Sequence, residues 1–184
     1  MSLLLLIDGY NVIPPVAPPG RGADPNWLQR ERMQFIQRLC HHLQESLRRR
    51  TCIVFDAADP PRDRPSRFSV DELRVVFAVG YAEADDLLEE IIADHSAPKQ
   101  LAVVSSDRRV QAAANRRGAT AYDSQDWLDQ LLDGRVQVAP SQQAKVRREG
   151  KGSGQDSDAK PDIDREDPKS GFGDTEQWLR DFGF

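Results

Sequence analysis

Five consecutive apolar residues, 3–7, stand immediately before Asp8 near the start of the chain. Because the run lacks the polar alternation of a half-exposed strand, it predicts a strand buried on both faces, as in the centre of a parallel sheet. Asp8 would then stand at the carboxyl edge of that sheet, where open α/β folds bind their ligands. Gly9 would let the chain turn sharply there, and Asn11 follows within reach. An Asp-Gly pair after a strand is also an ordinary turn signal, so this stretch alone decides little.

Strand and helix patterns alternate along the chain as far as about residue 135. Further strands are expected at residues 51–55, 74–79, 101–104 and 119–122. Helices are expected at residues 26–50, 84–95, 108–117 and 124–132. The proline-rich segments 14–25 and 57–69 are interpreted as loops beside the same edge. This alternation predicts an α/β fold with a central, mostly parallel five-stranded sheet and helices on both faces.

Acidic residues stand at the ends of the predicted strands or at the starts of the helices that follow. Asp8 and Asp56 end strands, Asp85 lies in the first turn of a helix, and Asp107 precedes another helix. Since parallel strands have all their carboxyl ends on one side, these acids are expected to converge on one rim. Helical periodicity turns Asp85 toward the apolar stripe and Asp86 outward. Ordinary alternatives remain, because acids also stabilise helix N-termini and cap turns.

Carboxylates that converge in this way repel one another unless a hard divalent cation offsets their charge. A site of carboxylate, amide and hydroxyl oxygens suits Mg²⁺ or Mn²⁺, and such an ion supports phosphodiester hydrolysis. The predicted metal ligands are Asp8, Asp56, Asp85 and Asp107, with a turn-capping role as the alternative for Asp56. Asn11 and Ser105 are expected to orient water or a substrate phosphate. The candidate catalytic residues are therefore Asp8, Asp85, Asp107, Asn11 and Ser105.

The formal net charge is −5, from 25 Lys and Arg against 30 Asp and Glu, so no global positive field indicates nucleic acid. Local basic patches can still bind RNA. Five arginines in or beside the same edge are candidate RNA-binding residues: Arg62, Arg64, Arg67, Arg108 and Arg109. Solvated surface arginines are the equally plain alternative.

Several other function classes lack their motifs in this chain. There is no glycine-rich phosphate loop, no dinucleotide fingerprint, no serine nucleophile elbow and no cysteine pairing at zinc spacing. The three histidines are expected on helix surfaces away from the rim. Cys40 and Cys52 stand among apolar neighbours and are interpreted as buried thiols. Without a signal peptide pattern or a membrane span, the chain is expected to be soluble and cytoplasmic.

Four motifs stand in order along the chain: Ile7-Asp8-Gly9-Tyr10-Asn11-Val12-Ile13, Val54-Phe55-Asp56-Ala57, Glu83-Ala84-Asp85-Asp86 and Ser105-Ser106-Asp107. Together they resemble the NYN family of PIN-like ribonucleases, in particular its YacP-like branch, over about residues 1–135. The resemblance implies a PIN-like three-layer α/β/α sandwich and metal-dependent endoribonuclease activity. It carries the family's acidic positions over to Asp8, Asp56, Asp85 and Asp107, and the branch's polar positions to Asn11 and Ser105. Asp86 stands where the branch often has Glu.

Three parts are therefore expected: a NYN/PIN-like nuclease domain at 1–137, a flexible polar linker at 138–171 and a short C-terminal amphipathic helix at 172–184. So short a helix is marginal alone and must dock on its own domain, on a second copy in a homodimer, or on a partner. The main hypothesis is a Mg²⁺- or Mn²⁺-dependent endoribonuclease that cleaves single-stranded RNA, in a ribosomal context through the tail. The alternative is a non-catalytic RNA- or ribosome-binding module with the same fold.

Overall fold

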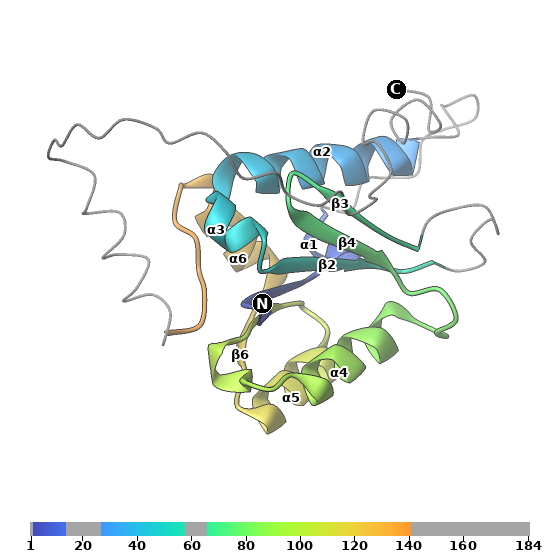
Figure 1. The fold of residues 1–184 in the computed structure, drawn as a ribbon, viewed down its shortest axis with the longest axis vertical. Helices are drawn as coiled ribbons and strands as arrows, with labels where there is room; N and C mark the ends of the chain where they lie inside the picture. The colour runs from blue at the N-terminus through green and yellow to red at the C-terminus, as the bar shows by residue number, and fades with distance from the viewer. Residues whose placement is uncertain (1, 14–26, 58–65, 141–184) are drawn as a thin grey trace, which may run out of the picture.

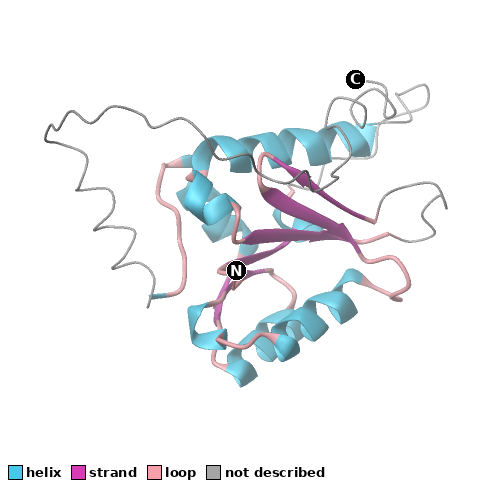
Figure 2. Ribbon diagram, viewed as in Figure 1, coloured by secondary structure: helices cyan, strands magenta, loops and turns pink. Residues whose placement is uncertain are grey.

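The computed structural model describes residues 2–13, 27–57 and 66–140, which form a six-stranded sheet between two layers of helices (Figures 1 and 2). The strands are β1 (Leu5–Asp8), β2 (Thr51–Phe55), β3 (Arg67–Val70), β4 (Leu73–Phe77), β5 (Ala102–Val104) and β6 (Thr120–Tyr122). Their order across the sheet is β3-β4-β2-β1-β5-β6. All neighbouring strands run parallel except β3 and β4. The predicted central position of the first strand is confirmed.

Helices cover both faces of the sheet. One layer contains α1 (Gly9–Val12), α2 (Trp27–His42), α3 (Glu45–Arg48) and α6 (Ser124–Leu132). The other contains α4 (Ala84–Asp94) and α5 (Arg108–Arg117), which lie side by side below the sheet in Figure 1. A single 3₁₀ turn, Pro98–Gln100, leads into β5.

The alternation of side chains along β1 decides on which face of the sheet the first acid lies. Leu5 and Ile7 pack in the core beneath α2 and α6, whereas Leu6 packs in the core beneath α4 and α5. Because successive side chains of a strand point to opposite faces, Asp8 follows Leu6 onto the α4 and α5 side. The first acid is thus directed toward the two helices that carry the later candidate acids.

The prediction of five strands was wrong, because β3 forms at the end of the segment interpreted as a loop. It pairs with β4 through a two-residue turn at Asp71 and Glu72, with Val70 opposite Leu73. The two turn residues have φ values of 50° and 70°. A two-residue hairpin turn of this hand normally carries Asn-Gly or Asp-Gly. Asp-Glu gives no such signal, so the hairpin is specified by the finished sheet rather than by local sequence.

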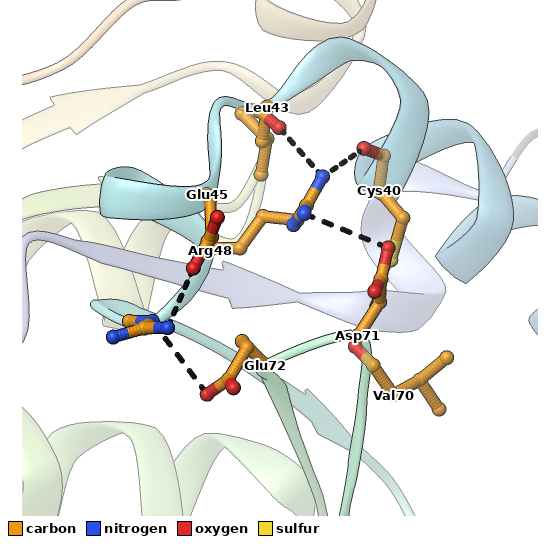
Figure 3. A network of polar contacts seen from close by, with 8 residues as sticks. Cys40, Leu43, Glu45, Arg48, Val70, Asp71 and Glu72 are labelled. Atoms are coloured by element: carbon orange, nitrogen blue, oxygen red, sulfur yellow. Dashed lines mark hydrogen bonds and ion pairs between the residues drawn. The ribbon is translucent and has the colours of Figure 1, made fainter. Parts of the chain in front are cut away.

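The single helix expected over residues 26–50 is two helices, and Arg48 holds the break between them (Figure 3). Its Nη1 donates to the carbonyl oxygens of Cys40 at 2.8 Å and of Leu43 at 3.2 Å. These carbonyls at the end of α2 have no helical partner of their own, and the guanidinium supplies one. Nη2 of the same side chain lies 3.6 Å from a carboxylate oxygen of Asp71, so the break is tied to the β3–β4 turn.

Two further details differ from the sequence-based expectations. His95 is buried rather than on the surface, with Nε2 3.0 Å from the carbonyl oxygen of Leu3. Packing of the domain continues to Val138 and Ala139, both buried, two residues beyond the expected boundary. Trp127 Nε1 donates to the carbonyl oxygen of Gln137 at 3.0 Å, which fixes this segment against α6.

Several expectations concern segments outside the described residues. They are the loop at 14–25, most of the loop at 57–69 with its Arg62 and Arg64, the linker beyond residue 140, and the C-terminal helix. Within the part of the chain that the structure describes, no helix is long and apolar enough to span a bilayer.

Candidate active site

Asp8 is a buried carboxylate at the carboxyl end of the central strand, with 3% of its surface exposed. It also caps α1, because its Oδ1 accepts a hydrogen bond from the backbone N of Asn11 at 3.4 Å. Its Oδ2 accepts two further bonds, from Asn11 Nδ2 at 2.6 Å and from Ser105 Oγ at 2.8 Å. Three bonds from two residues therefore fix the orientation of this carboxylate.

Gly9 allows the chain to leave the strand directly against the ring of Phe55. A Cβ atom at this position would lie 2.2–2.8 Å from three ring carbons of Phe55. Gly9 begins α1, so the need for glycine is space rather than an unusual backbone angle. The ring of Tyr10 packs edge-on against the same Phe55, with centroids 5.2 Å apart. The aromatic ring of β2 thus supports the turn that presents Asp8.

Ser105, immediately after β5, links Asp8 to Asp107. The serine is fully buried, and its Oγ accepts a hydrogen bond from the backbone N of Asp107 at 3.1 Å while donating to Asp8. Gln111 Nε2 donates to the Ser105 carbonyl oxygen at 2.7 Å and so anchors the same loop to α5. One hydroxyl therefore connects the ends of two parallel strands.

Asp107 caps the N-terminus of α5, which is the ordinary role that the sequence left open for an acid at this position. Its Oδ1 accepts hydrogen bonds from the backbone N of Arg109 at 2.6 Å and of Val110 at 3.4 Å. Both bonds use one oxygen, and among the described residues Oδ2 accepts none. Capping and a second role for the other oxygen are therefore compatible.

The charges of Asp8, Asp85 and Asp107 act on one another. The pKa of Asp85 is raised to about 6, first by burial and then by the neighbouring carboxylates of Asp107, Asp8 and Glu83, against a lowering effect of Arg109. Burial also raises the pKa of Asp8, opposed by the hydrogen bonds from Ser105 and Asn11. The structure thus brings together acids from β1, α4 and the β5–α5 loop, with Asn11 and Ser105 around them.

The remaining candidates are less closely joined to this centre. Asp56 is half-exposed at the end of β2 and is not among the described charges that act on Asp8 or Asp85. Arg67 is exposed on β3 and Arg108 on α5. Arg109 lies closer to the acids, and its guanidinium is paired with carboxylates of α4.

The donor chemistry of this centre fits a hard divalent cation. Within the described ranges, no three His, Cys, Asp or Glu side chains stand as a ready-made metal-binding group. Mg²⁺ in proteins is usually held by one or two carboxylates, with water and substrate phosphate completing the shell. The pKa of Asp85 is raised by burial first and then by the neighbouring carboxylates, whose negative charge a bound cation would offset. A site for Mg²⁺ or Mn²⁺ in which water and substrate complete the shell around the carboxylates is consistent with both observations.

Asp123 is a further acid at this edge that is not among the site residues predicted from the sequence. It follows β6, and its Oδ2 accepts a hydrogen bond from Ser106 Oγ at 2.9 Å. Its Oδ1 accepts from the backbone N of Gln125 at 2.9 Å, and the hydrogen bond from Ser106 lowers the pKa of Asp123. Its place after the last parallel strand was the signal that could have pointed to it. It orders the loop that carries Ser105.

Comparison with known proteins gives matches at the levels of family and fold. The family described as "YacP-like NYN domain" matches residues 5–165. The crystal structure of Rae1 (YacP) from Bacillus subtilis is 23% identical over 82% of this chain and 81% of that one, with a TM-score of 0.52. A point mutant of the same protein is 24% identical over 83% and 86%, with a TM-score of 0.50. No curated protein matches significantly. At this identity the likeness shows a shared fold, and the predicted PIN-like α/β/α architecture is confirmed.

Proposed function

This chain belongs to the family of YacP-like NYN domains, and from that premise we propose that it is a Mg²⁺- or Mn²⁺-dependent endoribonuclease that hydrolyses phosphodiester bonds in single-stranded RNA. The family lies in a nuclease-like superfamily, and its match extends beyond the residues 1–135 that carry the four motifs. One observation supports the proposal above all others. The buried carboxylate of Asp8 stands within electrostatic reach of Asp85 and Asp107 at the carboxyl edge of a parallel sheet.

In this proposal the metal is held by Asp8, Asp85 and Asp107, directly or through water, with Asp56 as a further ligand from β2. A hard divalent cation held there would lower the pKa of a water molecule and stabilise charge on a phosphoryl oxygen. Ionisation of Asp85 is then favoured, because a cation offsets the neighbouring carboxylates that raise its pKa.

The residues around the acids keep the site in one arrangement. Asn11 and Ser105 both donate to Oδ2 of Asp8, which fixes the plane of the carboxylate. Ser105 also receives the backbone N–H of Asp107, so displacement of the β5–α5 loop would disturb two acids at once. Preorganisation of this kind lowers the cost of reaching the transition state, because no side chain has to reorient during the reaction.

The exposed arginines Arg67 and Arg108, with Arg62 and Arg64 outside the described residues, are proposed to contact the RNA backbone. Contacts of this kind give affinity that falls as salt rises and carry no sequence preference. The further partners that we propose are the ribosome and, through the C-terminal segment, a second copy of the chain. We also propose a cytoplasmic setting, where Cys40 and Cys52 would remain the free thiols that the structure contains.

The proposal is tested by comparing Asp85→Asn with Asp94→Asn, an exposed acid at the far end of the same helix. Each protein is mixed with labelled single-stranded RNA, and binding in EDTA and cleavage in Mn²⁺ are measured separately. We expect Asp85→Asn to bind RNA as the wild type does and to lose cleavage, while Asp94→Asn retains both. If the wild type and Asp85→Asn bind RNA equally well and neither cleaves it, the protein is a non-catalytic RNA-binding module instead.

A further inference from the structure

Arg109 connects the first turn of α5 to the first turns of α4. Its Nη2 is paired with Asp86 Oδ1, its Nε donates to Glu89 Oε1 at 2.6 Å, and its Nη1 lies 3.7 Å from Glu83 Oε2. The three carboxylates flank Asp85 in sequence on both sides. One guanidinium therefore reaches across the helix pair to the segment that carries a candidate metal ligand.

The backbone of the same residue is bonded to the other candidate ligand on this pair of helices. Asp107 Oδ1 accepts the hydrogen bond from Arg109 N at 2.6 Å. A continuous path thus runs from the Asp107 carboxylate through Arg109 to Asp86, the neighbour of Asp85. Arg109 alone therefore connects Asp107 to Asp86.

The connection opposes a repulsion that the site itself creates. Asp85, in the first turn of α4, experiences the like charge of Asp107, the N-cap residue of α5, and this repulsion favours separation of the starts of the two helices. Single ion pairs at exposed positions contribute little to stability. A planar guanidinium that engages several carboxylates at once has the geometry to hold them in a fixed arrangement, which the ammonium group of a lysine lacks.

We propose that Arg109 is a positioning residue, whose guanidinium holds the start of α4 against α5 and so keeps Asp85 beside Asp107. This reassigns a residue that the sequence pattern grouped with the RNA-binding arginines. The consequence for metal binding depends on the proposed function, whereas the contact between the two helices does not. A second measurement can therefore separate the two.

The first experiment measures Mn²⁺ affinity of the metal-free protein by electron paramagnetic resonance, for wild type, Arg109→Ala and Arg108→Ala. Arg108 is the charge-matched control, because it is exposed in the same helical turn and has no ion pair among the described residues. Removal of a positive charge near a cation site should by itself strengthen Mn²⁺ binding. We expect Arg109→Ala to weaken it roughly 10-fold, as loss of supporting contacts around a metal site does, and Arg108→Ala not to weaken it. Equal or tighter binding by Arg109→Ala would overturn the proposal.

The second experiment follows amide hydrogen exchange of the metal-free protein in EDTA and needs neither activity nor a bound ion. We expect Arg109→Ala to speed exchange in α4 by about 3- to 10-fold relative to Arg108→Ala, because the helix opens locally without its connection to α5. Unchanged exchange in α4 would contradict the positioning role. If the wild type binds no Mn²⁺ while exchange still rises in Arg109→Ala, the proposed metal site is wrong and the positioning role stands.

Discussion

Ser105 donates a hydrogen bond to Asp8 over 2.8 Å, although 97 positions separate the two residues in the chain. The bond joins the carboxyl ends of β1 and β5, which are neighbouring strands in the sheet. The same Oγ accepts a hydrogen bond from the backbone N–H of Asp107, so one buried hydroxyl contacts two of the candidate acids. The arrangement of the site therefore depends on a residue that carries no charge.

Ser105→Ala should impair the site more than its small change in volume suggests. The hydrogen bond from Ser105 lowers the pKa of Asp8, so its loss should raise that pKa further. It also leaves the Asp107 N–H without its acceptor. We expect cleavage to fall about 10- to 100-fold, as it does when a ligand loses its supporting contact. Rates on labelled RNA and a carboxyl NMR titration of Asp8 measure the two effects.

Ser106→Ala is the matched control, since it removes the neighbouring hydroxyl, which is exposed and donates to Asp123 at 2.9 Å. We expect this variant to leave the Asp8 titration unchanged. An equal shift in both variants would mean that the loop as a whole, rather than the Ser105 hydrogen bond, controls Asp8.

The metal-free protein should lose stability as Asp85 ionises. Its pKa rises from an ordinary 3.8 to about 6, so the folded state binds this proton more tightly than the unfolded chain. The resulting stability is fully present below pH about 4 and is lost as pH rises through about 6. In EDTA, Asp85→Asn should therefore melt a few degrees above wild type at pH 7.5 and at the same temperature near pH 3.5.

Mn²⁺ should reverse that order, because a ligand that binds the folded state stabilises it. With saturating Mn²⁺ at pH 7.5, we expect the wild type to gain melting temperature and Asp85→Asn to gain little. Thermal melts of both proteins across pH, with EDTA or Mn²⁺, provide the measurement. A higher melting temperature of wild type in EDTA at pH 7.5 would contradict the assigned pKa shift.

Gly9→Ala should destabilise the domain by about 1–3 kcal/mol, because the new methyl group overlaps the ring of Phe55. Replacement of the ring by a smaller side chain should relieve this overlap. The double variant Gly9→Ala with Phe55→Leu is therefore expected to be more stable than the sum of the single variants indicates. Urea unfolding of all four proteins gives the coupling energy. Strict additivity would show that the two residues do not compete for space.

Glu72→Gly should raise stability, because Glu72 has a φ of 70° in the hairpin turn, where glycine has no steric cost. Glu72→Ala is the control, since it removes the same side chain and its 3.8 Å ion pair with Arg49 but keeps the steric cost. We expect the glycine variant to exceed the alanine variant by about 1 kcal/mol in the free energy of unfolding. A more stable alanine variant would contradict the observed turn conformation.

The parts of the fold that sequence could predict depend on local signals. The apolar run of β1 predicted a central buried strand, and the helix expected at residues 108–117 has the same limits as α5. The β3–β4 hairpin and the break between α2 and α3 could not be predicted, because the Asp71–Glu72 turn lacks the usual turn residues and Arg48 ties the break to Asp71 in a distant segment. Local propensity carries no information about such contacts.

In the candidate site, too, the features with a local signal could be predicted from the sequence, and those that depend on packing could not. Topology alone predicted Asp8 and Asp107 at one edge, and helical periodicity turned Asp85 toward the apolar stripe of its helix; in the structure the charges of these three acids act on one another. The engagement of Arg109 by α4 was not predictable, because its partners lie on a different helix. Sequence indicated which groups carry charge, whereas their pairing depended on how the helices pack.

Cleavage of labelled single-stranded RNA as a function of Mn²⁺ concentration tests the central claim most directly, with wild type and Asp8→Asn compared at each point. We expect wild-type cleavage to rise to saturation with Mn²⁺ and to stop in EDTA, and Asp8→Asn to be at least about 100-fold slower throughout. Wild-type cleavage that persists in EDTA, or an Asp8→Asn variant as fast as wild type, would contradict a metal-dependent site built on Asp8.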